Sequence, residues 1–110
     1  MGDNTLVGSV DLMHINKQHQ RGVLGFWVGH EYWGCGYCTE AAREIICFGF
    51  GELGLNRISA SCFARNAASR RVMQKIGMTC EGVFRQDMRK WDKFEDMERY
   101  SILASEWRVL

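Results

Sequence analysis

The hydrophobic pattern of this 110-residue chain switches from strand-like to helical spacing twice, and returns each time, which limits the folds available to it. Segments in which apolar and polar residues alternate, as they do in strands, flank two segments whose apolar residues recur at helical spacing. The first helical segment follows the glycine-rich run at residues 34–36, and the second follows Asn66. Because each helix lies between strands, we expect one α/β domain over residues 1–110, a mixed α+β sheet with the helices packed on it.

The predicted element order is β-β-α-β-α-β-β. The expected strands are residues 6–15, 23–28, 57–63, 80–88 and 94–104. The second strand is nearly all apolar, so we expect both of its faces to be buried. The last two strands flank the polar turn at residues 90–93, and this pattern predicts a hairpin.

The two predicted helices have recognisable ends. The apolar stripe of the first helix includes Phe48, and Gly54 is expected to end that helix in a left-handed conformation, with Leu55 folded back onto the last turn. Asn66 is placed to cap the second helix, and Gly77 to close it.

Composition excludes several classes of protein. Fourteen Lys and Arg against 13 Asp and Glu leave a net charge of +1, so no overall field directs the chain to nucleic acid or to an anionic membrane. No apolar run approaches the ~20 residues that span a bilayer, and residues 1–4 lack the features of a secretory signal. The odd number of cysteines predicts a cytoplasmic chain with free thiols, and Cys47, Cys62 and Cys80 are expected in the core.

The junction between the second strand and the first helix is the strongest candidate for a binding site. Gly34 and Gly36 let the backbone approach a ligand, and the first N–H groups of a helix have no partners within it, so a phosphate fits here. A dinucleotide fingerprint is excluded because Thr39 occupies the third glycine position, and a P-loop because Gly-Lys-Ser/Thr is absent. A glycine turn that merely joins strand to helix is the competing interpretation.

Cys35 and Cys38 form a C-x-x-C pair at the same junction, where the positive end of a helix favours a thiolate. A thiol-redox site is one interpretation, and coincidental thiols are the other. The absence of proline favours coincidence, because thioredoxin-like sites rely on a cis-proline. No metal site is expected, since the chain has no second C-x-x-C, no H-x-x-x-H and no H-E-x-x-H.

The start of the second helix is basic. Arg65, Arg70, Arg71 and Lys75 lie in or near it without an acidic residue, although helix dipoles favour cations at the other end. This arrangement indicates a phosphate-bearing partner. A solvated basic face, with Asn66 as an ordinary cap, is the alternative.

Together these segments resemble the GNAT superfamily of acyl-CoA-dependent N-acetyltransferases, in particular its ribosomal-protein branch. The family's Q/R-x-x-G-x-G/A loop corresponds to residues 31–36, and the branch's continuation G-Y-A-T-E-A to residues 36–41. Its N-x-x-S-x-x-V-x-x-K-x-G-F motif corresponds to residues 66–78. After it come Glu81, Gly82 and a strand with Asp96, Tyr100 and Leu103. The resemblance implies a mostly antiparallel sheet with one splayed parallel pair.

The resemblance also implies acetyl-CoA as the acetyl donor. The strand ending near Val28 and the strand at residues 57–63 are expected to splay apart and admit the pantetheine arm as though it were another strand. The residues expected to line the arm are Phe26, Trp27 and Val28. The residues expected to bind the pyrophosphate are Trp33, Gly34, Cys35, Gly36, Tyr37, Cys38 and Thr39. Those expected to contact the arm or the adenosine end are Asn66, Ser69 and Arg70.

The catalytic positions depart from the family pattern. Many relatives carry a carboxylate where this chain has Val23 and Leu24, and others carry a tyrosine where it has Met73. Ser69 is therefore expected to be the hydroxyl that assists the leaving thiolate.

Asp87 is the expected base, with His30 and Glu31 as alternatives. A free α-amine with a pKa of about 7.8 costs only ~1 kcal/mol to deprotonate at neutral pH, whereas a lysine-like amine near pKa 10.4 costs about 5 kcal/mol. A site with a weak base therefore favours α-amino acceptors.

The largest departure is at the N-terminus. Family members begin with a strand, two helices and another strand before the segment that here starts near Leu6. We therefore expect a fragment, a short form completed by a partner chain, or a coenzyme binder without turnover, and an uncovered edge favours a homo-oligomer. The expected function is acetyl transfer to an amine, preferentially a protein or peptide α-amine. A noncatalytic coenzyme A-binding module is the alternative, and a C-x-x-C thiol oxidoreductase a remote one.

Overall fold

The computed structural model describes residues 8–28 and 37–107, and the side chains of residues 10–25 and 39–107. The strands are β1 Gly8–Asn16, β2 Arg21–Val28, β3 Arg57–Phe63, β4 Thr79–Lys90 and β5 Lys93–Leu103. The helices are α1 Tyr37–Gly51, α2 Ala67–Lys75 and the short 3-10 helix η2 Ala104–Glu106. The predicted order of strands and helices is confirmed.

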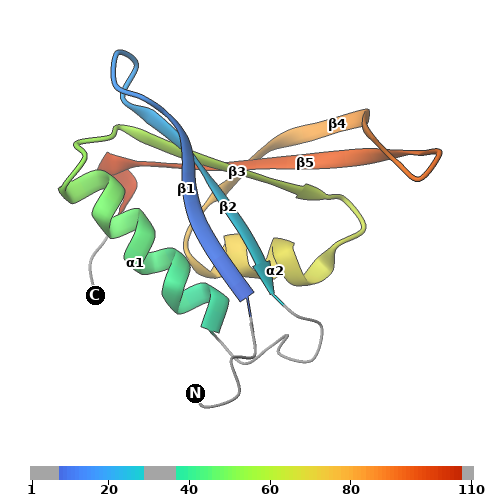
Figure 1. The fold of residues 1–110 in the computed structure, drawn as a ribbon, viewed down its shortest axis with the longest axis horizontal. Coiled ribbons are helices and arrows are strands. Elements are labelled where there is room, and N and C mark those ends of the chain that lie inside the picture. Colours follow the sequence, from blue (N-terminus) through green and yellow to red (C-terminus); the bar gives the residue numbers. More distant parts are fainter. Residues whose placement is uncertain (1–7, 29–36, 108–110) are drawn as a thin grey trace.

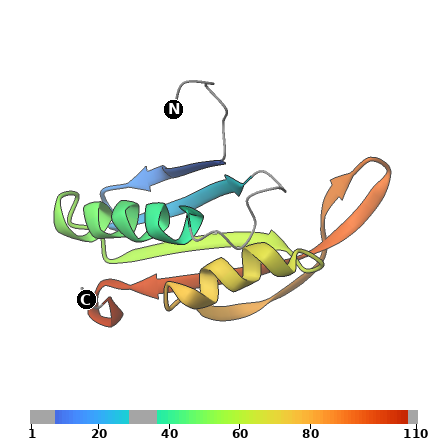
Figure 2. The same ribbon diagram turned by 90° about the horizontal axis from the view of Figure 1, so that it is seen from below.

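The strands form one mixed sheet in the order β1-β2-β3-β5-β4. β2 and β3 are parallel, and the other neighbouring pairs are antiparallel. Figures 1 and 2 show α1 and α2 on the same side of this sheet, with the β4–β5 hairpin extending beyond the helices. The predicted α/β architecture is therefore confirmed, with one face of the sheet covered by the described helices.

The ends of the helices follow from single residues. The Asn66 side chain accepts a hydrogen bond from the Ser69 N–H, and Gly77 has a φ of 90° just after α2, as expected for a cap and a terminating glycine. α1 ends at Gly51, three residues before the predicted Gly54. Gly54 nevertheless has the predicted left-handed φ of 66°, and the N–H of Leu55 turns back to donate to the Gly49 carbonyl.

The core lies between the helices and the sheet face that they cover. Its fully buried large side chains are Leu24, Ile46, Ile58, Met73 and Ile102. β3 alternates as predicted, because Ile58, Ala60 and Cys62 are buried while the intervening residues are partly or fully exposed. Within the described residues, no helix is long and apolar enough to cross a membrane.

Two predictions about burial are wrong. β2 is not buried on both faces, because Val23 and Gly25 on its second face are only partly buried. Phe48 is 50% exposed rather than part of the core. The described helices cover a single face of the sheet, which explains the error for β2. α1 buries only a narrow stripe that includes Ala42 and Ile46, which explains the error for Phe48.

The cysteine prediction is correct for one residue of three. Cys62 is buried, whereas Cys47 and Cys80 are exposed free thiols. Cys47 follows the buried Ile46 and therefore points about 100° away from it around α1. Cys80 lies on β4, the strand at the edge of the sheet.

Replacing Ile46 with alanine is expected to lower the free energy of unfolding by about 2–5 kcal/mol, because Ile46 is fully buried and its loss leaves a cavity. Phe48→Ala in the same helix is the matched control, with an expected cost below about 1 kcal/mol. Urea unfolding followed by circular dichroism measures both values. Equal losses would contradict the assignment of the buried stripe.

Candidate functional site

The parallel pair of strands separates soon after it forms. β2 and β3 are paired only at Arg21 with Arg57, Gly22 with Ile58 and Val23 with Ser59. Beyond these positions β2 continues to Val28 and β3 to Phe63, but no ladder joins them. The predicted splayed pair is confirmed.

Each strand remains paired along its other edge. β2 stays in register with β1 as far as Val28 with Gly8, and β3 stays in register with β5 as far as Phe63 with Met97. Only the edges of β2 and β3 that face each other, at residues 24–28 and 60–63, are without a ladder. An extended ligand that carries amide groups can hydrogen-bond to such edges as an additional strand does. We call this gap the split.

The start of α2 lies just beyond the end of β3, which is one wall of the split. The Asn66 Oδ1 accepts the Ser69 N–H at 3.1 Å, and Ser69 is partly buried. The cap therefore uses the acceptor atom of the Asn66 amide and leaves its NH₂ group as a donor. Met73, on the same helix, is fully buried and belongs to the core.

An ion pair fastens the start of α2 to β5. Arg70 donates from Nε to Oε1 of Glu98 at 2.9 Å and from Nη2 to Oε2 at 3.3 Å. Nη2 also donates to the Ala64 carbonyl, at the end of β3. Hydrogen bonding to Glu98 raises the pKa of Arg70. Arg70 was predicted to contact the coenzyme, and the structure shows its guanidinium engaged within the protein.

Tyr100 completes this network. Its hydroxyl donates to Oε1 of Glu98 at 3.0 Å, and burial together with that hydrogen bond raises the pKa of Tyr100 to about 12. Glu98 thus accepts hydrogen bonds from a helix and from its own strand. The sequence did not indicate this role, although Glu98 lies two residues before Tyr100 and so shares its face of β5.

Several predicted coenzyme-binding positions lie outside the described residues, namely Trp33, Gly34, Cys35 and Gly36, together with His30 and Glu31. The backbone at positions 26–28 forms the last part of β2, which is one wall of the split. Positions 37 and 38 begin α1, and Thr39 in its first turn is buried. Figures 1 and 2 show the start of α1 near the end of β2.

The structure does not place Asp87 at the split. Residues 85–87 form a bulge in β4 opposite Asp96, whose Oδ1 accepts the Gln86 N–H at 2.8 Å. Asp87 is exposed there, and β5 lies between its strand and β3. Its role as a base stays a prediction. In the described part of the chain, no group of three or more metal-ligating side chains comes together.

Comparison with known proteins identifies relatives of the whole described fold. The family model of the acetyltransferase (GNAT) domain matches residues 1–79. YnaD, an uncharacterized N-acetyltransferase of Bacillus subtilis, is 42% identical over 84 residues, which are 76% of this chain and 49% of YnaD. An FsC-acetyl coenzyme A-N(2)-transacetylase of Aspergillus fumigatus is 40% identical over 88 residues, covering 76% of this chain and 36% of that protein.

Among solved structures, a ribosomal-protein-S5-alanine acetyltransferase from Vibrio fischeri superimposes with a TM-score of 0.88 at 25% identity. The match covers 98% of this chain and 60% of that protein. The chain therefore spans only about half the length of the curated relatives that it matches.

Cys62 is expected to resist alkylation in the folded protein. Burial and the charge of Glu98 raise its pKa from 9.0 to about 11, which lowers its thiolate population about 100-fold relative to an ordinary thiol. Exposed Cys47 is the internal control. Iodoacetamide at pH 8, followed by peptide mass spectrometry, should modify Cys47 at least about 100-fold faster. Comparable rates would contradict the buried position of Cys62.

Proposed function

Because the chain belongs to the GNAT acetyltransferase domain family, we propose that it is the coenzyme-binding part of an N-acetyltransferase that uses acetyl-CoA. The split between β2 and β3 is the observation that carries this proposal. The pantetheine arm has amide groups along an extended chain, so unpaired strand edges are suitable partners for it. The junction before α1, with Gly34 and Gly36, is proposed to bind the pyrophosphate at the positive end of the helix.

The reaction that fits this arrangement is direct acyl transfer. The nitrogen of a neutral amine attacks the thioester carbon, an N–C bond forms, and the C–S bond breaks. The amine loses its proton to solvent or a base, and the coenzyme thiolate takes one up. We propose that the Ser69 hydroxyl assists this thiolate, since Ser69 lies in the first turn of α2 beside the end of β3.

We propose a protein or peptide α-amine as the acceptor. An α-amine needs little help to lose its proton at neutral pH, which suits a site with no carboxylate at Val23 or Leu24. The Vibrio fischeri relative is a ribosomal-protein-S5-alanine acetyltransferase, which supports the same class of acceptor. A homo-oligomer is proposed as well, because edge strand β4 carries exposed Val83 and Phe84.

Asn66 is proposed to have two roles. Its Oδ1 caps α2, which leaves the amide NH₂ to donate to a carbonyl of the pantetheine arm. Arg70 is proposed to act indirectly, because its guanidinium is committed to Glu98 and holds the start of α2 in place.

A noncatalytic coenzyme A-binding module is the second candidate. The position where other family members carry a tyrosine is occupied by Met73, which is fully buried and supplies no proton. This candidate shares the split with the first and differs only in turnover.

Acetyl-CoA is expected to raise the melting temperature and to release coenzyme A thiol when a peptide with a free α-amine is added. At 100 times the dissociation constant, binding stabilises the folded state by about 2.7 kcal/mol. Differential scanning fluorimetry and a thiol-release assay measure the two effects. Stabilisation without thiol release would favour the noncatalytic module, and the absence of stabilisation would contradict both candidates.

The control for the thiol-redox alternative is the double variant Cys35→Ser and Cys38→Ser. Acetyl transfer is expected to fall only slightly, because both residues are proposed to contribute backbone amides rather than thiols. A complete loss would instead support redox chemistry at this pair.

Two substitutions of Asn66 are expected to separate its roles. Asn66→Ala removes the cap and lowers the free energy of unfolding by about 1 kcal/mol, whereas Asn66→Asp retains a capping oxygen. Both remove the amide donor, so both should weaken acetyl-CoA binding. Urea unfolding and calorimetric titration test this. Unchanged coenzyme affinity in Asn66→Asp would exclude the proposed contact.

A further inference from the structure

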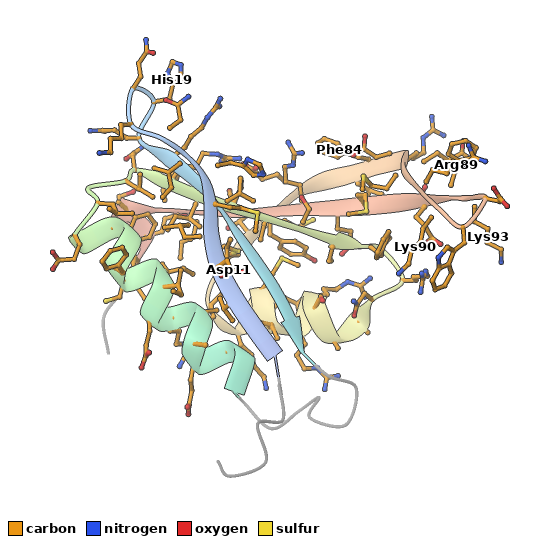
Figure 3. The ribbon with its side chains drawn as sticks, in the orientation of Figure 1. Asp11, His19, Phe84, Arg89, Lys90 and Lys93 are labelled. Carbon is orange, nitrogen blue, oxygen red and sulfur yellow. The ribbon has the colours of Figure 1, made fainter. Side chains whose placement is uncertain are left out.

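We propose that Asp11 on β1 binds the ammonium group of the acceptor, an inference that rests on the proposed function. β2 and β3 lie on either side of the split, and β1 lies beside β2. Asp11 is the only acidic residue in the sequences of these three strands. It is exposed, and Figure 3 shows it on β1, next to β2.

The register places Asp11 beside the start of the split. Asp11 is paired with Gly25, two residues beyond Val23, where β2 makes its last pair with β3. One strand spacing of about 5 Å thus separates the backbone of Asp11 from the edge that faces the split. A carboxylate can bridge this distance to an amine directly or through one water molecule.

Asp11 lies on the face of the sheet opposite the described helices. Its neighbour Leu12 packs against the core. Leu12 also lies close to α1, since a Cβ built on Gly49 of α1 would be only 3.2 Å from Leu12 Cδ2. Since side chains alternate along a strand, Asp11 and Met13 point to the other face, together with Gly25 and Val23. The amine can therefore approach the split from the side that is free of α1 and α2.

The surroundings of Asp11 suit an amine on an aliphatic chain. Gly25 has no side chain, and a Cβ there would collide with Cε of Met13, so the methyl group of Met13 lies over Gly25, the residue paired with Asp11. The nearest charged residue on this face of β2 is Arg21, which is four residues from Gly25, or about 13 Å along the strand. On the same face, β3 offers the hydroxyl of Ser59, which is in the last rung of the ladder, and the hydroxyl of Ser61, which lies across the split.

Asp11 is proposed to select the acceptor and not to replace, as a base, the carboxylate that β2 lacks. Acceptors with a charged ammonium would be held beside the split by Asp11 and lose a proton to water before attack. Neutral or anionic groups at the acceptor nitrogen would gain nothing from Asp11. The residue is thus assigned to acceptor selection, and coenzyme binding does not require it.

The test measures the binding of trialanine amide to the coenzyme A-bound protein by isothermal titration calorimetry. Asp11→Asn is expected to weaken binding about fivefold, the upper end for a solvent-exposed ion pair, and to abolish the loss of affinity that added NaCl causes in the native chain. Asp11→Glu should restore part of the affinity. N-acetylated trialanine amide, which has no ammonium, should be unaffected by either change.

Asp92→Asn is the matched control, because Asp92 is an exposed aspartate at the tip of the β4–β5 hairpin. It should bind the peptide amide as the native chain does. Unchanged peptide affinity in Asp11→Asn, or an equal loss of coenzyme affinity, would overturn the assignment of Asp11. If the native chain releases no thiol yet binds the peptide in an Asp11-dependent way, the proposed function falls and the Asp11 site stands.

Discussion

The three-residue ladder between β2 and β3 joins the two halves of the molecule. On one side are β1 and β2, and on the other β3, β5 and β4. α1 spans the junction, because a Cβ on Gly49 would lie 2.9 Å from Ile58 Cδ1 of β3 and 3.2 Å from Leu12 Cδ2 of β1. Only a residue without a side chain lets the helix approach both strands so closely. The halves are held at one end, and the strands can diverge at the other.

The divergence is compatible with stability because each wall has its own support. β1 pairs with the whole of β2 beyond the ladder, and β5 does the same for β3. On the second wall, Glu98 links β5 to α2 through Arg70. Burial and Glu98 raise the pKa of Tyr100 to about 12, above the ordinary value near 10. The protonated hydroxyl of Tyr100 therefore stabilises the fold fully below pH ~10, the pKa of an ordinary tyrosine. This contribution is lost as the pH rises through about 12, the pKa of Tyr100 in the folded state.

Local patterns were sufficient for the order of the elements and for most of their ends, because each depends on residues close together in the sequence. The cap at Asn66 and the left-handed Gly54 and Gly77 are examples. α1, which ends three residues before Gly54, is an exception. The partner of Arg70 was not predictable in this way, since Glu98 is 28 residues away and meets it only through the register of β3 and β5. The basic start of α2 predicted a phosphate contact, whereas the structure pairs one of its arginines with a carboxylate. Likewise, helical periodicity gave the stripe of α1 but not its width, so Phe48 was misplaced.

The single-sided covering of the sheet connects these errors to the proposed chemistry. A nearly apolar β2 predicted burial on both faces, yet Val23 and Gly25 remain partly accessible on the face opposite α1 and α2. A ligand held along the split by backbone groups lies in the plane of the sheet, so its reactive end is reachable from either face unless the helices block one. Here the helices and the core block the face of Leu24, which is buried. We therefore propose that the acceptor comes from the face of Asp11, where a carboxylate favours amines that arrive with a positive charge.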